Sequence, residues 1–306
     1  MTARTEKVGT GFSTSPRGDK RKLIVTADDF GAALAVNEAV ERAHREGILT
    51  AASLMVSAPA AADAVARAKT LPRLGVGLHL VLVEGRPTLP PADIPDLVDS
   101  GGMFRGDMVR ASFAMFLRPK LRRQLAAEIE AQFQAFAATG LELDHVNAHK
   151  HFHLHPTIAG LIVRIGRRFG MKAMRVPYEP ARVLRQIEPR AGGNLVVELW
   201  ARRLRKRLAD AGIFSPDRMF GLGWSGAMTT ARLAGLIAHL PEGVSEIYLH
   251  PATKPDYAGA TQGYLYEQEL AALVSNQAIE YTKENNIVLG LFADFLPRGE
   301  GGMVGR

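Results

Sequence analysis

The sequence of 306 residues contains no cysteine. Disulfide bonds, thiolate metal ligands and thiol nucleophiles are therefore excluded, and any metal chemistry must use histidine and carboxylate side chains. The chain also lacks an apolar run of the about 18 residues that span a membrane, and its N-terminus lacks the apolar segment of a signal peptide. We therefore expect a cytoplasmic protein, either soluble or peripheral at the inner membrane surface.

Basic residues are in slight excess, with a formal net charge of +7, but the excess is unevenly placed. Residues 1–22 carry six basic and two acidic side chains in a segment rich in Gly, Ser and Thr, which predicts a disordered tail. A second basic cluster at 201–210 is typical of a solvated helix face, or of a surface that contacts anionic lipid or phosphate. No nucleic-acid-binding module is recognisable, so we expect no nucleic-acid partner.

Short apolar segments alternate with helical patterns along the chain. The strand candidates are 23–27, 49–56, 74–80, 142–147, 173–176, 219–222, 246–250 and 287–293. The helical patterns lie at about 33–47, 60–70, 120–138, 157–169, 195–211, 229–239 and 266–284. Such alternation predicts a parallel sheet with helical crossovers, and the number of strands favours an α/β, TIM-barrel-like (β/α) barrel. An open doubly wound sheet is the alternative, although no GxGxxG motif follows the first strand.

One domain accounts for the whole pattern. We expect it at 23–296, between the basic tail at 1–22 and a flexible tail at 297–306, with long loops at 81–119 and 177–194. Four polar motifs, "ADD", "GLH", "HVNAH" and "YLHP", each lie at the end of a predicted strand. Sites in barrels and open α/β sheets form at the carboxyl ends of strands, so these motifs are expected to meet there.

Asp28 and Asp29 close the first predicted strand. Successive residues of an extended strand point to opposite faces. Both carboxylates therefore reach one site only if the strand ends here, and Gly31 gives the turn conformational room. The alternative interpretation is an exposed pair, or a cap for the helix that begins near Ala33.

His79 lies in the apolar segment "LGVGLHLVLVEG". A lone histidine in such a segment is more often a hydrogen-bonded core residue than a ligand, so its role depends on its partners. Gly75 and Gly77 leave space beside the strand, which would suit a substrate cavity.

Five of the nine histidines fall within eleven positions, at His145, His149, His151, His153 and His155. In an extended strand this period-two run would spread over roughly 33 Å, whereas a zinc–imidazole bond is only about 2 Å long. One ion therefore cannot bind them all unless the chain coils sharply. One or two are expected to be ligands, while the others shape the pocket or orient the ligands.

A catalytic metal site needs about three protein ligands and open positions for water and substrate. One carboxylate of the aspartate pair, His79 and one histidine of the run would supply this set. The other aspartate could then accept a proton from water, and His250 could protonate a leaving group. Mixed Asp/His ligation suits one divalent ion, Zn²⁺ or Mg²⁺, with Mn²⁺ and Fe²⁺ as further candidates.

These motifs together resemble those of the YdjC-like carbohydrate deacetylase family, over about residues 22–295. The matching segments are "ADDFG", "GILTAASLMV", "GVGLHL", "HVNAHKHFHLHP" and "EIYLHP". The resemblance implies a barrel-like fold and metal-dependent hydrolysis of the N-acetyl group of an amino sugar. By motif position, the implied metal ligands are Asp29, His79 and His149. Asp28 resembles the general base, and His250 a proton donor or substrate contact.

The remaining polar residues of the histidine run, His145, Asn147, His151 and His153, are implied to support the ligands. One of them departs from the family pattern, because Asn147 stands where relatives commonly have Asp in "HxDxH". Asparagine still forms hydrogen bonds but brings no charge to the neighbouring imidazoles. Metal affinity or preference is therefore expected to differ from that of relatives with Asp.

"GIFSPDRMFGLGWSGAMT" at 212–229 and "GYLYEQELAAL" at 263–273 resemble a narrower branch, the hopanoid biosynthesis-associated HpnK proteins. This resemblance implies an N-acetylglucosaminyl hopanoid as substrate and a peripheral contact with a membrane surface. The candidate substrate contacts are Glu84, Trp224 and Met228, of which the latter two would line an apolar approach. A homodimer is also compatible with the sequence.

Two alternative functions fit the same residues. A metal-dependent hydrolase of another bond, such as a phosphoesterase or a different amidohydrolase, would use the same ligands on another substrate. A non-catalytic lipid-binding protein would instead keep a structural metal in a closed, four-ligand site. Assays on a panel of substrates separate these hypotheses. A deacetylase releases acetate, a phosphoesterase releases phosphate, and a non-catalytic protein releases no acetate from any glycan or glycolipid.

Overall fold

The computed structural model describes residues 20–106 and 118–297. The predicted tails at 1–22 and 297–306 therefore lie almost entirely outside the described residues, as does 107–117 of the predicted loop at 81–119. Strand β1 (Arg21–Phe30) begins with two residues that the sequence assigned to the basic tail. No helix in the described ranges is both long enough and apolar enough to cross a membrane.

A parallel sheet with the order β4-β3-β2-β1-β6-β5 forms the centre of the fold, and β7 pairs with the first residues of β1. The strands that join β1 are β2 (Ala51–Leu54), β3 (Gly75–Leu80), β4 (Val146–Ala148), β5 (Arg218–Phe220), β6 (Gly243–Leu249) and β7 (Val288–Leu289). Bridges from Val146 to Met174 and from Ala173 to Phe214 continue the sheet beyond β4. The sheet is thus curled into a barrel-like α/β domain, which confirms the predicted fold class.

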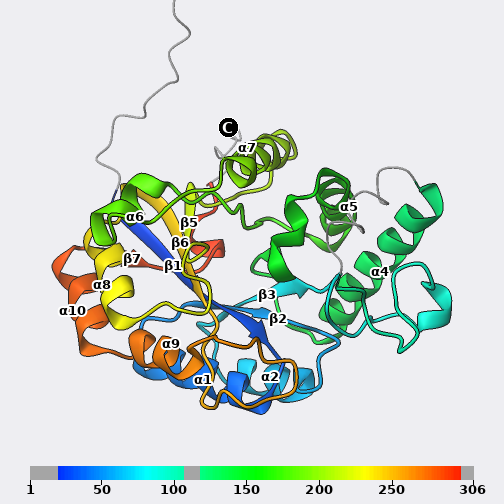
Figure 1. The fold of residues 1–306 in the computed structure, drawn as a ribbon, viewed down its shortest axis with the longest axis horizontal. Helices are drawn as coiled ribbons and strands as arrows, with labels where there is room; N and C mark the ends of the chain where they lie inside the picture. Colours follow the sequence, from blue (N-terminus) through cyan, green and yellow to red (C-terminus); the bar gives the residue numbers. More distant parts are fainter. Residues whose placement is uncertain (1–19, 107–117, 298–306) are drawn as a thin grey trace, which may run out of the picture.

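Helices surround this curled sheet (Figure 1). They are α1 (Leu34–Glu46), α2 (Ala61–Ala68), α4 (Pro119–Ala138), α5 (Pro156–Gly166), α6 (Ala181–Ile187), α7 (Leu195–Asp210), α8 (Thr230–Ala238), α9 (Tyr266–Leu273) and α10 (Asn276–Glu284). Short 3₁₀ helices are η1 (Pro91–Asp93), η2 (His149–Leu154), η3 (Arg167–Phe169) and η4 (Ala293–Phe295). The helical pattern predicted at 266–284 is two helices, because Ser275 caps α10 by accepting a hydrogen bond from the Ala278 amide. Helix α6 lies within the segment predicted as a loop at 177–194.

Strands β2, β3, β4 and β6 are buried on both faces over nearly their whole length, as expected for parallel strands between helices and a barrel interior. Every residue of β3, for example, is buried. The glycines of β3 do not open a substrate cavity, contrary to the sequence-based expectation. A Cβ at Gly77 would lie 2.5 Å from the His145 ring, and one at Gly75 would lie 2.7 Å from the Asp144 carboxylate. The space beside them is filled by these two side chains.

Candidate metal and active site

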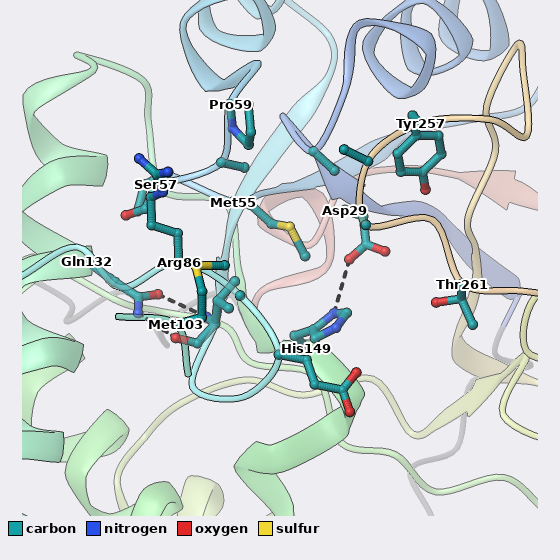
Figure 2. A pocket seen from close by; sticks show the side chains of 18 residues that line it. Asp29, Met55, Ser57, Pro59, Arg86, Met103, Gln132, His149, Tyr257 and Thr261 are labelled. Carbon is teal, nitrogen blue, oxygen red and sulfur yellow. Dashed lines mark hydrogen bonds and ion pairs between the residues drawn. The ribbon is translucent and has the colours of Figure 1, made fainter. Parts of the chain in front are cut away.

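Three side chains from separate strand ends meet at one point. Asp29 Oδ1 lies 3.2 Å from His79 Nε2 and 3.3 Å from His149 Nδ1, and the possible ligand atoms of all three lie within 4.8 Å of one another. Asp29 Oδ1 and His79 Nε2 are buried without a hydrogen-bond partner. Buried polar atoms rarely stay unpaired, so a donor set of one carboxylate and two imidazoles that converges in this way fits a divalent metal ion. Figure 2 shows Asp29 and His149 facing each other.

The backbone at the end of β1 explains how two adjacent carboxylates reach this point. Asp29 has φ +63°, which is uncommon for a residue with a side chain, and the pairing of β1 with β2 shifts register between Ala27 and Phe30. The strict alternation of side chains is therefore broken at Asp29 itself. Gly31 follows with φ +96°, as expected for the turn. The alternative role as a helix cap does not apply, because α1 has no side-chain cap.

The histidine run coils instead of extending. Lys150 and His151 have φ of +51° and +53°, and the chain winds into η2 directly after His149. The chain does coil sharply here, but the coil separates the histidines instead of gathering them around one point. His149 joins the metal site, His145 points into the barrel interior, and the ring of His155 stacks on Trp200.

His151 and His153 are close enough to the buried Arg175 to be affected by its charge. Burial lowers the pKa of both imidazoles, and the Arg175 charge lowers it further, to about 3 for His153. Both side chains are therefore neutral near pH 7. His151 Nε2 lies 3.1 Å from the Tyr248 hydroxyl, and its predicted role in supporting the ligands stays a prediction.

Asn147 connects the candidate metal ligand His79 with Asp28. Its Oδ1 lies 2.7 Å from His79 Nδ1, and its Nδ2 donates to Asp28 Oδ1 at 3.1 Å and to Ser53 Oγ at 2.8 Å. An amide oxygen can only accept, so His79 carries a proton on Nδ1, and Nε2, which faces Asp29, is the nitrogen that a metal could use. That is the protonation state in which an imidazole binds a metal.

The hydrogen-bonded chain continues from Ser53 toward the opposite end of the barrel. Ser53 Oγ lies 3.0 Å from His145 Nε2, and His145 Nδ1 lies 2.9 Å from Asp144 Oδ2. Asp144 also accepts a hydrogen bond from the Ala293 amide. Because Ser53 accepts from Asn147, its own hydroxyl is free to donate to His145, and every member of the chain is satisfied. Ser53 and Asp144 were not among the predicted supporting residues.

Asp28 is held by a buried arginine that the sequence analysis missed. Arg175 Nη1 lies 2.5 Å from Asp28 Oδ2, Arg175 Nη2 lies 2.9 Å from Asp28 Oδ1, and the arginine also donates to Glu246 Oε1. Burial alone would raise the pKa of Asp28, but the Arg175 guanidinium and His79 outweigh it and hold that pKa well below its usual range. Asp28 is therefore ionised. A charged residue within the apolar segment at 173–176 was the signal that could have revealed Arg175.

His250 follows β6 and approaches both aspartates. Its charge is among the causes that lower the pKa of Asp28 and of Asp29. Its backbone amide donates to Glu269 Oε2 at 2.5 Å, while its ring Nδ1 is buried without a hydrogen-bond partner. The ring centroids of His250 and Tyr264 are 5.1 Å apart. The structure thus brings the predicted proton donor to the same edge as the metal ligands.

A cavity of about 310 Å³ opens beside Asp29 and His149. Its walls are largely apolar, with polar side chains at the edges (Figure 2). The other lining residues include Met55, Val56, Ser57, Val81, Glu84, Arg86, Met103, Gln132, Tyr257 and Thr261. Glu84 lines this cavity and pairs with Lys150, and its role as a substrate contact stays a prediction.

Trp224 and Met228 do not line this cavity. They are only 6% and 1% exposed, and the Trp224 indole donates to Glu188. The expected apolar approach along these two side chains is therefore not what the structure shows. Their burial has a local cause, since the Met228 amide and the His250 amide share the Glu269 carboxylate as acceptor and tie the two segments together.

Comparisons with known proteins place this geometry in context. Residues 22–284 match the sequence profile of the YdjC-like protein family. A carbohydrate deacetylase of Geobacillus stearothermophilus is 31% identical over 280 residues, which cover 90% of this chain and 98% of that protein. A carbohydrate deacetylase of Brevibacillus brevis is 40% identical over 157 residues, or 51% of this chain and 60% of that protein.

A solved structure shares the fold. The crystal structure of a candidate cellobiose-phosphate cleavage protein from Enterococcus faecalis superposes with a TM-score of 0.72. The sequence identity is 23%, and the superposition covers 91% of this chain and 100% of that one. At this level of identity the likeness concerns the barrel-like arrangement of strands and helices.

Proposed function

This chain belongs to the YdjC-like family, and we propose that it is a metal-dependent carbohydrate deacetylase that hydrolyses the N-acetyl group of an amino sugar. The observation that carries the proposal is the convergence of Asp29, His79 and His149 on buried ligand atoms, with the ionised Asp28 beside them. Relatives that match almost their whole length to this chain are carbohydrate deacetylases. The reaction class is thus amide hydrolysis.

Asp29, His79 and His149 would hold the ion. A divalent metal bound there supplies a Lewis acid that polarises the acetyl carbonyl and lowers the pKa of a water. Two imidazoles and one carboxylate suit Zn²⁺, whereas Mg²⁺, Mn²⁺ or Fe²⁺ would take more water ligands. The Asn147 contact with His79 Nδ1 favours binding, because it directs the lone pair of Nε2 into the site.

Asp28 acts as the general base in this proposal. Its Oδ1 accepts from both Asn147 and Arg175, whereas its Oδ2 accepts from Arg175 alone. A carboxylate oxygen has two lone pairs, so Oδ2 keeps one for the proton of the attacking water. The low pKa makes Asp28 a weak base, so it acts on a water whose own pKa has been lowered. Arg175 fixes the carboxylate in one orientation, which is the geometric requirement for proton transfer.

His250 would donate the proton that the departing amine needs. Its buried ring Nδ1 has no hydrogen-bond partner among the described residues, so this atom is available for such a contact. The anchoring of its backbone amide by Glu269 keeps the ring at the carboxyl end of β6. Asp28 and His250 are then a base and an acid provided by two neighbouring strands, β1 and β6.

The cavity beside Asp29 suits one sugar unit. A volume of about 310 Å³ is at the lower end of the roughly 300–1,000 Å³ typical of ligand pockets. Its apolar walls fit the C–H faces of a pyranose, and Glu84 and Arg86, which are among the lining residues, offer partners for hydroxyl groups. We propose, as the finer assignment, that this unit is the N-acetylglucosamine of a hopanoid glycolipid, a substrate that implies a peripheral membrane contact.

The deciding experiment incubates purified protein of known metal content with N-acetylglucosaminyl hopanoid and, separately, with chitobiose. Mass spectrometry follows loss of an acetyl group from each compound, and an acetate assay gives the rate. Deacetylation of the glycolipid alone supports the finer assignment, and deacetylation of chitobiose assigns a soluble substrate. Release of phosphate instead of acetate from a wider panel would contradict the deacetylase proposal.

A further inference from the structure

The outward face of helix α7 carries two different sets of side chains. Leu195, Val196 and Leu199 are exposed in its first two turns, at 82%, 64% and 52%. Exposed basic residues follow at seven-residue intervals from these three positions, at Arg202, Arg203 and Lys206. Seven residues are close to two full turns of an α-helix. The apolar set and the basic set therefore lie on the same side of α7, about 10 Å apart along its axis.

The opposite face fixes α7 to the protein. Ala201, Leu204 and Leu208 are buried in the core. Arg207 Nη1 donates to the Pro156 carbonyl at 2.6 Å, and the Trp200 ring stacks on His155 at the end of the segment that provides the ligand His149. These contacts hold α7 against the segment that includes the candidate ligand His149, and the exposed face of α7 points away from it.

The first turn of α7 is formed although its apolar side chains face water. Asn194 caps the helix by accepting hydrogen bonds from the amides of Val196 and Val197. Adjacent exposed apolar side chains on an ordered helix are characteristic of interaction sites. Among the described residues, the large exposed apolar side chains elsewhere are scattered singly, at Leu34, Met103, Leu265 and Val288.

We propose that this face of α7, defined by Leu195, Val196, Leu199, Arg202, Arg203 and Lys206, docks on the surface of an anionic lipid bilayer. The apolar set enters the boundary between headgroups and acyl chains, and the basic set contacts the lipid phosphates. The chain's net charge of +7 adds a long-range attraction to such a surface.

The basic set is accessible to phosphate. Arg203 forms no ion pair with any described residue, whereas Arg202 pairs with Glu198 and Lys206 with Asp210. Both pairs are exposed and join residues four apart on one helix, so they are weak and a phosphate can compete for the cation. The remaining cations of α7 are bound to backbone carbonyls of the protein, Arg205 to that of Asp217 and Arg207 to that of Pro156.

A second copy of the chain fits this face less well than a bilayer. A stable interface between proteins buries about 800 Å² per partner, and three apolar side chains beside a basic patch cannot supply that area. A lipid surface needs only a few inserted side chains, because electrostatic attraction adds to their transfer energy.

The biological role of this docking rests on the proposed function, because the enzyme would meet an amino sugar with a lipid tail at a membrane surface. The docking itself depends on α7 alone. Vesicle binding and acetate release from a soluble N-acetylated sugar therefore report on the two proposals separately. Wild-type protein that binds vesicles but releases no acetate from any substrate would contradict the function and leave the docking in place.

The test compares binding of the full chain to vesicles of phosphatidylglycerol and phosphatidylcholine with binding to phosphatidylcholine alone. Each basic side chain near an anionic surface contributes a factor of about five to partitioning. We expect R202Q/R203Q/K206Q to lower binding to anionic vesicles at least tenfold, and L195S/V196S/L199S to lower it to a similar extent. The matched control L34S/L265S/V288S, which changes exposed apolar residues elsewhere, should bind as the wild type does.

A second measurement locates the contact on α7. The chain has two tryptophans, and the W224F variant leaves Trp200 on α7 as the reporter. Its fluorescence should be quenched by brominated lipid in anionic vesicles, and this quenching should be lost in the L195S/V196S/L199S background. Equal vesicle binding by wild type and both α7 variants would overturn the proposal. So would a dimer in sedimentation velocity that L195S/V196S/L199S converts to monomer with vesicle binding unchanged.

Discussion

Asn147 Oδ1 lies 2.7 Å from His79 Nδ1, and this contact keeps a proton on Nδ1 and leaves Nε2 as the nitrogen that would bind a metal. The same amide donates to Asp28 on its other side. One neutral side chain therefore orients a metal ligand and the proposed base together. An aspartate at this position could accept from His79, but it could not donate to Asp28 and would place a second negative charge beside it.

We expect Asn147→Leu to weaken metal affinity by about 10- to 100-fold, the usual effect of removing a hydrogen-bond partner of a ligand. The physical reason is that His79 loses the acceptor that holds its proton on Nδ1. Titration of metal-free protein with Zn²⁺ by calorimetry measures the change. Asn276→Leu, at an exposed position of α10, is the matched control. Affinity within twofold of the wild type would show that Asn147 does not orient His79.

Replacement of Asp28 by Asn should separate chemistry from metal binding. Asp28→Asn removes the carboxylate that accepts the proton but leaves Asp29, His79 and His149 in place, so acetate release should be lost while bound metal is retained. His79→Ala and His149→Ala should lose both. Metal content by elemental analysis, measured beside acetate release, tests all three variants. Full activity in Asp28→Asn would exclude its role as the base.

Arg175 should be the most costly buried side chain to replace. Arg175→Met leaves Asp28 and Glu246 buried without their countercharge, and breaking a buried pair in this way costs about 3–5 kcal/mol in the free energy of unfolding. Urea denaturation measures the loss. Arg168→Met, which breaks the exposed pair with Glu130, should change stability by about 0.5 kcal/mol or less. Similar losses in the two variants would contradict the structural importance of Arg175.

Metal removal should lower thermal stability as well as activity. A ligand that binds only the folded state stabilises it by about 2.7 kcal/mol at a concentration 100 times its Kd. The melting temperature of chelator-treated protein should therefore rise when Zn²⁺ or Mg²⁺ is returned. The same addition should leave His149→Ala unchanged, because one ligand of the triad is missing. A rise of equal size in that variant would place the ion elsewhere.

The sequence was sufficient for the parallel strands and for the polar motifs at their carboxyl ends, because both follow from local patterns. Those patterns left open which aspartate and which histidine of the run join His79. The family resemblance identified Asp29 and His149, and the structure brings these three side chains together, while their roles as metal ligands stay predictions. The Arg175 contact with Asp28 was not predictable, since it joins residues 147 positions apart and no periodic pattern encodes such a pair. Burial of Trp224 was missed for a similar reason, because its partner Glu188 lies in another loop.

The glycines of β3 show most clearly what composition alone cannot reveal. The absence of a side chain at Gly77 was interpreted as open space, but the His145 ring occupies it and a Cβ would lie 2.5 Å from that ring. Overpacking of this kind typically costs about 1–3 kcal/mol, so Gly77→Ala should destabilise the protein measurably. It should also displace His145 from Ser53. Because Ser53 contacts Asn147, and Asn147 contacts His79, the orientation of the His79 ring should become less well fixed.

Gly77→Ala should therefore reduce Zn²⁺ affinity as well as the urea midpoint, although Gly77 contacts neither the metal site nor the cavity. Gly192→Ala is the matched control, because a Cβ there meets nothing within 4 Å. If Gly77→Ala lowers stability without changing metal affinity, the chain from Asp144 to Asn147 serves packing alone. If stability and Zn²⁺ affinity both fall in Gly77→Ala while Gly192→Ala changes neither, the hydrogen-bonded chain in the barrel interior helps to position the metal ligands.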